Sequence, residues 1–280
     1  MTPEREKELE VLACKARLGI LEGVFNAKCG HPGGSLSAAE ILTYLYFEQM
    51  NVDPSNPKAE NRDRFVLSKG HVAPGLYAVL ALRGFFPVED LKSLRKNGSY
   101  LQGHPSMKLC PGVDMSTGSL GQGISAAVGM ALGAKVAGNG VRVYTLCGDG
   151  EIEEGQVWEA AMFAGNKKLD NLVAVIDYNG LQIDGSLEEV NSPAPIPEKF
   201  AAFGWNVLEI DAHSFPAIEA AFALTPSADG KPTCIVAKSV KGKGVSYMEN
   251  QASWHGAAPN AEQYAQGKEE LEAALAALTA

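Results

Sequence analysis

The sequence lacks the features that mark membrane-spanning and exported proteins. No uncharged apolar run reaches the roughly 18 residues that a membrane-spanning helix needs. Residues 2–10 are highly charged, whereas a secretory signal contains an apolar stretch. The five cysteines include no CxxC pair, so we expect reduced and mostly buried thiols. These absences predict a cytoplasmic protein that makes no membrane contact.

Positive charge is also scarce. Lys and Arg together number 24 against 33 Asp and Glu, which gives a net charge of −9. A nucleic-acid-binding surface needs a basic patch, so this balance argues against such a partner. The length of 280 residues is sufficient for one large α/β domain with a full core. Because we find no internal repeat and no clear boundary, we expect a single domain over residues 1–280.

The segment from residue 141 to 184 organises the rest of the chain. Residues 141–147 are predicted to form a buried strand that ends in Gly-Asp-Gly, and a helix is expected over 153–167. A second apolar strand over 172–176 then ends in Asp-Tyr-Asn. This strand–loop–helix–strand unit predicts parallel pairing of the two strands.

Further strands and helices alternate along the chain. Strands are expected at 64–68, 206–210 and 233–239, and helices at 4–28, 124–136, 215–224 and 262–278. We also expect residues 31–34 to form a loop and Ser37 with Glu40 to form a capping box that starts a helix to about Met50. The alternation predicts an α/β fold with a parallel β-sheet flanked by helices on both faces.

Two polar residues follow the strands of the central unit. Asp149 follows the first strand and Asn179, thirty positions later, follows the second. Ligands bind at the carboxyl ends of parallel strands, and hard oxygen ligands suit Mg²⁺ together with a ligand phosphate. Gly148 and Gly150 would let a phosphate approach the backbone closely. The pattern therefore predicts a site for a metal ion and a phosphate.

Four of the five histidines lie in loops that contain glycine or proline. They are His31, His71, His104 and His255. Loops held by a rigid scaffold are where catalytic groups tend to lie, so we expect these four to share a site. Imidazoles there can hydrogen-bond hydroxylated substrates and move protons near neutral pH. His213 precedes a plausible helix N-cap, Ser214, and we interpret it as structural.

Seven segments together resemble the transketolase family, in the order that the family has them. The Gly-Asp-Gly sequence, about thirty residues and then Asn form the thiamine diphosphate fingerprint. The segments are GHPGGSLSAAEIL, LSKGHVAPGLYA, GHPS, GSLGQG, GDGEIEEG, DYNGLQIDG and WHG. They extend across the whole N-terminal, diphosphate-binding domain of that family. Full-length transketolases often have Pro where Ser119 stands, which would alter loop stiffness but not backbone contacts.

The resemblance implies a thiamine diphosphate-binding fold and a role for each matching residue. The implied Mg²⁺ ligands are Asp149, Asn179 and the main-chain carbonyl of Leu181. The implied contacts of the cofactor are His71, Gly150, Asn179 and His255 at the diphosphate end, and Gly118 and Leu120 at the aminopyrimidine. His31, His104 and His255 would line the substrate channel as catalytic residues, and Glu154 would lie at a subunit interface linked to the partner site.

The resemblance also implies that this sequence is only part of an enzyme. In transketolases, the glutamate and the aromatic platform for the pyrimidine lie in later domains, as do most groups for the sugar phosphate. This sequence ends after the helix expected at 262–278, about where the second domain would begin. We therefore expect the diphosphate-binding subunit of a split transketolase of the pentose phosphate pathway, active only with a C-terminal, pyrimidine-binding subunit in an α₂β₂ heterotetramer. Its reaction would move a two-carbon ketol unit from a ketose phosphate to an aldose phosphate.

Other functions remain open from the sequence alone. An α subunit of a 2-oxo acid dehydrogenase shares the fingerprint but lacks the ordered HPGG, KGH and GHP loops. 1-Deoxyxylulose-5-phosphate synthase is nearer, although the GHPS-to-GSLGQG stretch here looks like transketolase. A dinucleotide-binding domain would explain the G-x-G-x-x-A match at residues 121–126, but no strand precedes it. A non-catalytic subunit that keeps only the fold is the last alternative.

Overall fold

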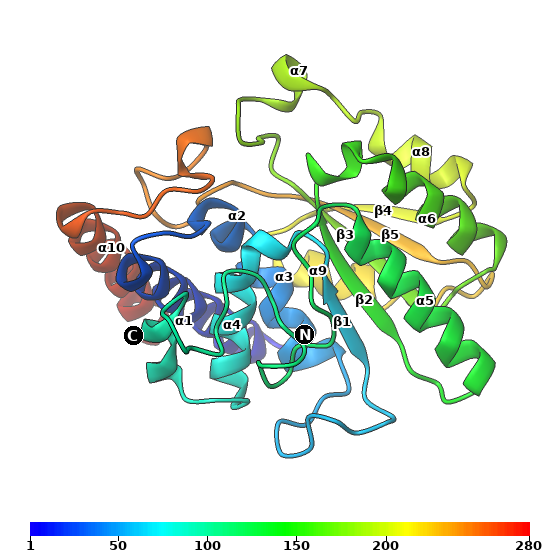
Figure 1. Ribbon diagram of the computed structural model, residues 1–280, viewed down its shortest axis with the longest axis horizontal. Helices are drawn as coiled ribbons and strands as arrows, with labels where there is room; N and C mark the ends of the chain where they lie inside the picture. Colours follow the sequence, from blue (N-terminus) through cyan, green and yellow to red (C-terminus); the bar gives the residue numbers. More distant parts are fainter.

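Five parallel strands form the centre of the structure, a computed structural model that describes all of residues 1–280. The strands are β1 (Arg64–Leu67), β2 (Val143–Gly148), β3 (Leu172–Tyr178), β4 (Asn206–Asp211) and β5 (Thr233–Lys238). Their order across the sheet is β1-β2-β3-β5-β4, and every neighbouring pair is parallel (Figure 1). The predicted parallel sheet is confirmed.

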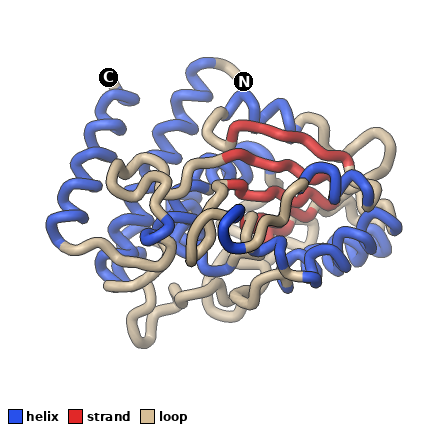
Figure 2. Tube along the Cα trace, turned by 90° about the horizontal axis from the view of Figure 1, so that it is seen from above, coloured by secondary structure: helices blue, strands red, loops and turns tan.

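Alternate side chains along each strand enter two separate apolar cores. On β1, Phe65 and Leu67 enter one core and Val66 enters the other. The first core is covered by α1 (Pro3–Ala27), α3 (Ala39–Tyr44), α4 (Ala73–Arg83) and α9 (Phe215–Phe222). The second is covered by α5 (Gln122–Ala137), α6 (Gly155–Asn166) and α8 (Ile196–Ala202). Helices thus cover both faces, and Figure 2 shows the strands as one layer between them.

Shorter elements and the last helix complete the chain. The long helix α10 (Ala261–Thr279) packs beside α1, where Phe25 and Tyr264 stack with ring centroids 4.0 Å apart. The short helical segments are α2 (Pro32–Ser37), η1 (Leu45–Gln49), η2 (Gly70–Val72), η3 (Val88–Ser93), η4 (Glu151–Glu153), α7 (Leu187–Val190) and η5 (Ala252–Trp254). None of the helices combines the length and apolar character that crossing a membrane requires. All five cysteines are free thiols, and only Cys29 is exposed.

The prediction for residues 31–50 is wrong in two respects. Residues 32–37 form the helix α2 rather than a loop, because Pro32 occupies the first helical turn, where its fixed φ is already suitable. Ser37 and Glu40 form no capping box, since the Ser37 hydroxyl donates to Asp177 at 2.6 Å and Glu40 pairs with Arg17. Both side chains are buried, and buried polar groups take the partners that the tertiary structure provides.

Candidate active site

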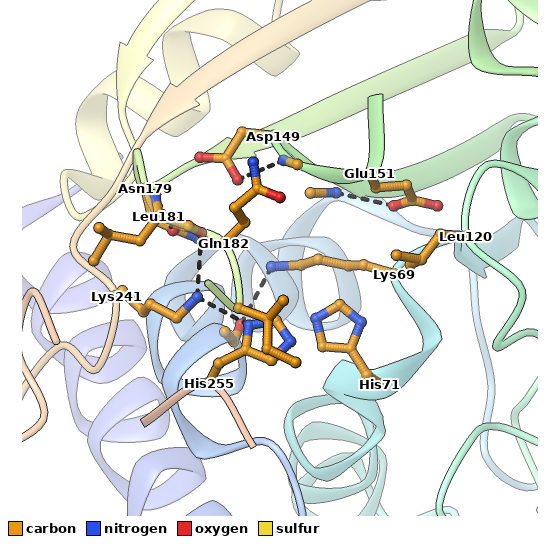
Figure 3. Close-up of a pocket in the computed structure, with 14 residues that line it drawn as sticks. Lys69, His71, Leu120, Asp149, Glu151, Asn179, Leu181, Gln182, Lys241 and His255 are labelled. Carbon is orange, nitrogen blue, oxygen red and sulfur yellow. Dashed lines mark hydrogen bonds between the residues drawn. The ribbon is translucent and has the colours of Figure 1, made fainter. Parts of the chain in front are cut away.

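A cavity of about 220 Å³ lies at the carboxyl ends of four strands. Lys69 follows β1, Asp149 follows β2, Asn179 follows β3 and Lys241 follows β5, and all four line the cavity. Figure 3 shows them facing a common space with His71 and His255. The sheet therefore gathers residues that are far apart in the sequence, including most of those predicted for cofactor binding.

Asp149 is a buried carboxylate whose negative charge is only partly compensated by its hydrogen bonds. Its side chain accepts hydrogen bonds from the backbone N–H of Gly150 at 2.9 Å and of Gly180 at 2.6 Å. Only 2% of the residue is exposed. Burial, reinforced by the charge of Asp177, raises the pKa of Asp149 to about 6. A cation beside this carboxylate would relieve both effects, so the site suits a metal ion.

The other two predicted metal ligands lie beside Asp149. Gly180, which donates to Asp149, stands between Asn179 and Leu181 in the chain. The Asn179 side-chain oxygen accepts from the Leu181 N–H at 3.2 Å, and the Leu181 carbonyl accepts from Lys241 Nζ at 3.2 Å. One carboxylate, one amide oxygen and one main-chain carbonyl are hard donors of the kind that Mg²⁺ prefers. The residues present therefore fit a Mg²⁺ ion bound together with a diphosphate.

Lys69 and Asp177 form a buried ion pair beside the cavity that the sequence analysis did not identify. Each residue is 2% exposed, and Lys69 Nζ also donates to the Gly34 carbonyl at 3.2 Å. Burial alone would raise the pKa of Asp177, but Lys69, with the hydroxyls of Ser37 and Ser239, holds it below its ordinary value. Lys69 lies in the KGH segment and Asp177 in the DYN segment, 108 positions apart.

Glu151 is a second buried acid that the sequence analysis missed. Its carboxylate accepts from the Ser68 hydroxyl at 2.5 Å and from the N–H groups of Gly121 and Gly148 at 3.0 Å each. Burial raises the pKa of Glu151 above its ordinary value. These bonds join the ends of β1 and β2 to the loop that carries Leu120, a residue at the cavity wall. Glu151 therefore holds together the backbone that frames the cavity.

Three of the four loop histidines form one cluster. The ring centroids of His31, His71 and His255 lie 5.0–5.4 Å from one another. His104 is held against Gly118, where a Cβ atom would lie 3.1 Å from the His104 ring. Gly118 also has a φ of +148°, so a side chain there would be strained. The predicted shared site is thus a cluster of three rings, with His104 on the adjoining loop.

The clustered imidazoles are neutral at pH 7. Burial, then the charges of Arg95, His104 and Lys241, lower the pKa of His31 to about 4. Burial and Lys241 lower the pKa of His255 to about 3, and burial and Lys69 hold the pKa of His71 well below its ordinary value. The Nδ1 atom of His31 is buried without a hydrogen-bond partner. Neutral rings of this kind can both donate and accept hydrogen bonds to a polar ligand.

Lys241 fixes the orientation of His255. Its ammonium lies 3.1 Å from His255 Nδ1, and burial lowers the pKa of Lys241 to about 8. An ammonium only donates, so Nδ1 of His255 is the unprotonated nitrogen and Nε2 carries the hydrogen. His255 therefore presents an N–H donor through Nε2.

Glu154 lies apart from the cavity. It is an exposed residue at the start of α6, and its Cβ would be 2.8 Å from a Cβ atom placed on Gly121. Its side chain is therefore available to a partner, and its Cβ atom lies close to Gly121 of the loop beside the cavity. Gln182, which the sequence analysis did not select, lines the cavity and donates to Glu153 at 2.8 Å.

Comparison with known proteins finds similarity of this chain to one family. The family model "Transketolase, thiamine diphosphate binding domain" matches residues 10–274. The 6-deoxy-6-sulfo-D-fructose transketolase subunit SqwG of Clostridium sp. (strain MSTE9) is 46% identical over 269 residues, which cover 96% of this chain and 98% of that protein. An apulose-4-phosphate transketolase subunit from Phocaeicola vulgatus is 45% identical, with 94% and 93% of the two chains covered.

Full-length transketolases match over only part of their length. Mouse transketolase is 42% identical over 264 residues, which cover 91% of this chain and 41% of that protein. The crystal structure of transketolase from Campylobacter jejuni superimposes with a TM-score of 0.89 at 35% identity, over 97% of this chain and 43% of that one. This chain thus spans about two fifths of a full-length relative and nearly all of the relatives that are named as subunits.

Proposed function

This chain belongs to the transketolase family as a thiamine diphosphate-binding subunit, and we propose that, joined to a pyrimidine-binding subunit, it transfers a two-carbon ketol unit from a ketose phosphate to an aldose phosphate. The observation that carries this proposal is the convergence of Asp149, Asn179 and the Leu181 carbonyl at the wall of one cavity. The neutral histidine cluster at the same cavity supports it. Both relatives are named as transketolase subunits, so they do not favour the dehydrogenase and synthase alternatives.

Mg²⁺ and the cofactor's diphosphate would share the oxygen-rich side of the cavity. Asp149, Asn179 and the Leu181 carbonyl would hold the metal ion. His71, Gly150, Asn179 and His255 would contact the diphosphate, and Gly118 and Leu120 would approach the aminopyrimidine through their backbone. When bound, thiamine diphosphate supplies the nucleophilic carbon and the electron sink for carbon–carbon bond chemistry.

The histidines would form hydrogen bonds and transfer protons in the substrate channel. His255 would donate through Nε2, because its Nδ1 already accepts from Lys241. His31 and His104 would accept or return a proton at the sugar hydroxyl that reacts, since neutral imidazoles can act in either direction. The unpartnered Nδ1 of His31 supports a role toward a polar ligand.

We propose an α₂β₂ assembly in which the second chain supplies the pyrimidine-binding residues. This chain matches the two relatives that are named as subunits over 98% and 93% of their length, which supports a split enzyme. Glu154 would lie at a subunit interface, in keeping with its exposure at the start of α6. We also propose that residues 1–280 form one domain around the single sheet, and that the enzyme works in the cytoplasm, where free thiols persist.

The substrate class is proposed from the family and from the named relatives. One relative is named for 6-deoxy-6-sulfo-D-fructose and the other for apulose 4-phosphate. We propose phosphorylated sugars of the pentose phosphate pathway as the first substrates to test, with branched and sulfonated sugars as the comparison set. All three groups share the ketose and aldose chemistry that the site is expected to serve.

Isolation of the natural complex tests the proposal. The chain is expressed with a tag in its native host, and the copurifying subunit is identified by mass spectrometry. We expect ketol transfer by the complex with thiamine diphosphate and Mg²⁺, none by the chain alone, and loss of transfer on chelation of the metal. The variant Asp149→Asn should lose at least about 100-fold in Mg²⁺ affinity, whereas Asp170→Asn, at a half-buried site outside the cavity, should not. Turnover by the chain alone, or none by the complex on any of these sugars, would contradict the proposal.

A further inference from the structure

Two buried side chains and one half-buried side chain form a connected network outside the cavity. Arg17 on α1 donates to both carboxylate oxygens of Glu40 at 2.6 and 2.7 Å. Oε2 of this carboxylate, which Arg17 contacts at 2.7 Å, also lies 3.1 Å from His213 Nδ1. Arg17 and Glu40 are each only 7% exposed. We call this set the Arg17–Glu40–His213 network.

Stability alone is a weak explanation for such a network. Removing two charges from water is costly, and well-packed apolar residues in place of a buried ion pair are often neutral or stabilising. Burial opposes ionisation of Glu40, yet Arg17 and His213 hold the pKa of Glu40 below its ordinary value. Glu40 thus remains an ionised acceptor in the interior, which fixes the direction of every bond around it.

The network ends on the backbone at both sides of Lys241. His213 Nε2 accepts from the N–H of Val240 at 2.9 Å, and Arg17 Nε donates to the carbonyl of Lys243 at 3.0 Å. Because the Val240 N–H is the donor, His213 carries its hydrogen on Nδ1 and donates it to Glu40. The residue before Lys241 and the residue two positions after it are therefore fixed by one continuous set of hydrogen bonds.

Lys241 is the residue of this segment that enters the cavity. Its buried ammonium donates to the Leu181 carbonyl, a predicted metal ligand, and orients His255 through Nδ1. The distances from Lys241 Nζ to the Leu181 carbonyl, 3.2 Å, and to His255 Nδ1, 3.1 Å, depend on the position of the backbone of residues 240–243. A small displacement of this backbone would therefore disturb a metal ligand and a histidine together.

We propose that the Arg17–Glu40–His213 network is a positioning device for Lys241, through the bond from Val240 to His213 on one side and from Arg17 to Lys243 on the other. His213 is then a positioning residue of the cavity. This proposal extends the interpretation of His213 as a structural residue. The proposal rests on the proposed function only for the identity of the cofactor that Lys241 would meet.

Two variants of His213 separate positioning from a purely structural role. The amide of Asn reaches the place of Nδ1, so His213→Asn keeps the bond to Glu40 and loses the acceptor for Val240. The amide of Gln reaches the place of Nε2, so His213→Gln keeps the acceptor for Val240. Positioning of Lys241 therefore predicts a large defect in H213N and a small one in H213Q, which keeps the acceptor for Val240 but loses the bond from that acceptor to Glu40. If His213 served only as a partner of Glu40, H213Q would show the larger defect and H213N the smaller one.

Lysine labelling reads out the position of Lys241 without any cofactor. The full chain is treated with trace acetic anhydride, and each acetylated lysine is quantified by mass spectrometry. We expect Lys241 to react about fivefold faster in H213N, as the loss of one hydrogen bond allows, and within twofold of wild type in H213Q. Lys238 is the internal control, because its side chain is 63% exposed and outside the network. Equal Lys241 rates in all three proteins, or a faster rate in H213Q alone, would overturn the proposal.

Cofactor affinity provides the second readout, on the assembled complex. H213N should raise the Kd for thiamine diphosphate about fivefold, the ratio that corresponds to the loss of one hydrogen bond. H213Q should keep the Kd within twofold of wild type. If wild-type complex binds no thiamine diphosphate, the proposed function fails and the labelling result still decides the role of His213. If labelling changes as expected and the Kd does not, positioning of Lys241 toward the cofactor is refuted.

Discussion

The buried pair of Lys69 and Asp177 gives the sharpest prediction for stability. In the variant Lys69→Met the carboxylate stays buried and loses its only cationic partner, while the bonds from Ser37, Ser239 and Asn179 remain. Breaking a buried pair on one side costs about 3–5 kcal/mol, and the remaining bonds place this case near the lower value of about 3 kcal/mol. For a chain of this size, Tm should then fall by roughly 6–10 °C.

The pH dependence of this loss has a definite sign. Asp177 has a lowered pKa in the wild type, so its contribution to stability is present above the ordinary carboxyl pKa and is lost as pH falls. Without Lys69 the pKa of Asp177 should rise, because burial is then opposed only by neutral donors. Protonation would relieve the buried charge, so the deficit of Lys69→Met should be larger at pH 7 than at pH 5.

Urea unfolding followed by circular dichroism measures this loss, with two further variants for comparison. Lys135→Met breaks an exposed pair with Asp170 and should cost less than about 0.5 kcal/mol. The double variant Lys69→Met/Asp177→Asn removes the stranded charge and should recover more than half of the loss. A deficit below about 1 kcal/mol at pH 7, or a double variant no better than the single one, would refute this account of the pair.

Two other predictions concern glycine and histidine at the cavity. Gly118→Ala should destabilise the chain by about 1–3 kcal/mol in thermal unfolding, because φ is +148° and the new Cβ would lie 3.1 Å from His104. Gly84→Ala is the control, since its φ is also positive but nothing lies within 4 Å; equal losses in the two variants would count against the contact with His104. Nitrogen NMR should find His31 and His255 neutral at pH 5.5, because their pKa values are lowered to about 4 and about 3. The unfolded chain protonates these rings first, so stability should decline as pH falls from about 6.5 toward 4, and a charged ring at pH 5.5 would disprove this.

The sheet and the Gly-Asp-Gly region could be predicted because local patterns determine them. Apolar runs locate β2 and β3 to within two residues at each end, and the carboxyl end of β3 extends to Tyr178. The fingerprint then places Asp149 and Asn179 at neighbouring strand ends, as the structure has them. The N-cap role of Ser214 is also confirmed, since its side chain accepts from Ala217.

The buried charges could not be predicted because their partners are distant in sequence. Lys69 and Asp177 are 108 positions apart, and nothing in either segment indicates that the two would be neighbours. The same reasoning explains the error at Ser37 and Glu40. Their spacing fits a capping box, but Glu40 is held by Arg17, which lies 23 positions earlier on another helix. Spacing alone carries no information about such contacts.

The strand order has a consequence for how the chain acquires its site during synthesis. β4 is made before β5, yet β5 is the only strand with which β4 pairs, so β4 leaves the ribosome with no place in the sheet. β5 must then enter between β3 and β4, and Lys241 and His255 follow it. Because Lys241 and His255 line the cavity together with Asp149 and Asn179, the cavity cannot be complete until residue 255 has been made.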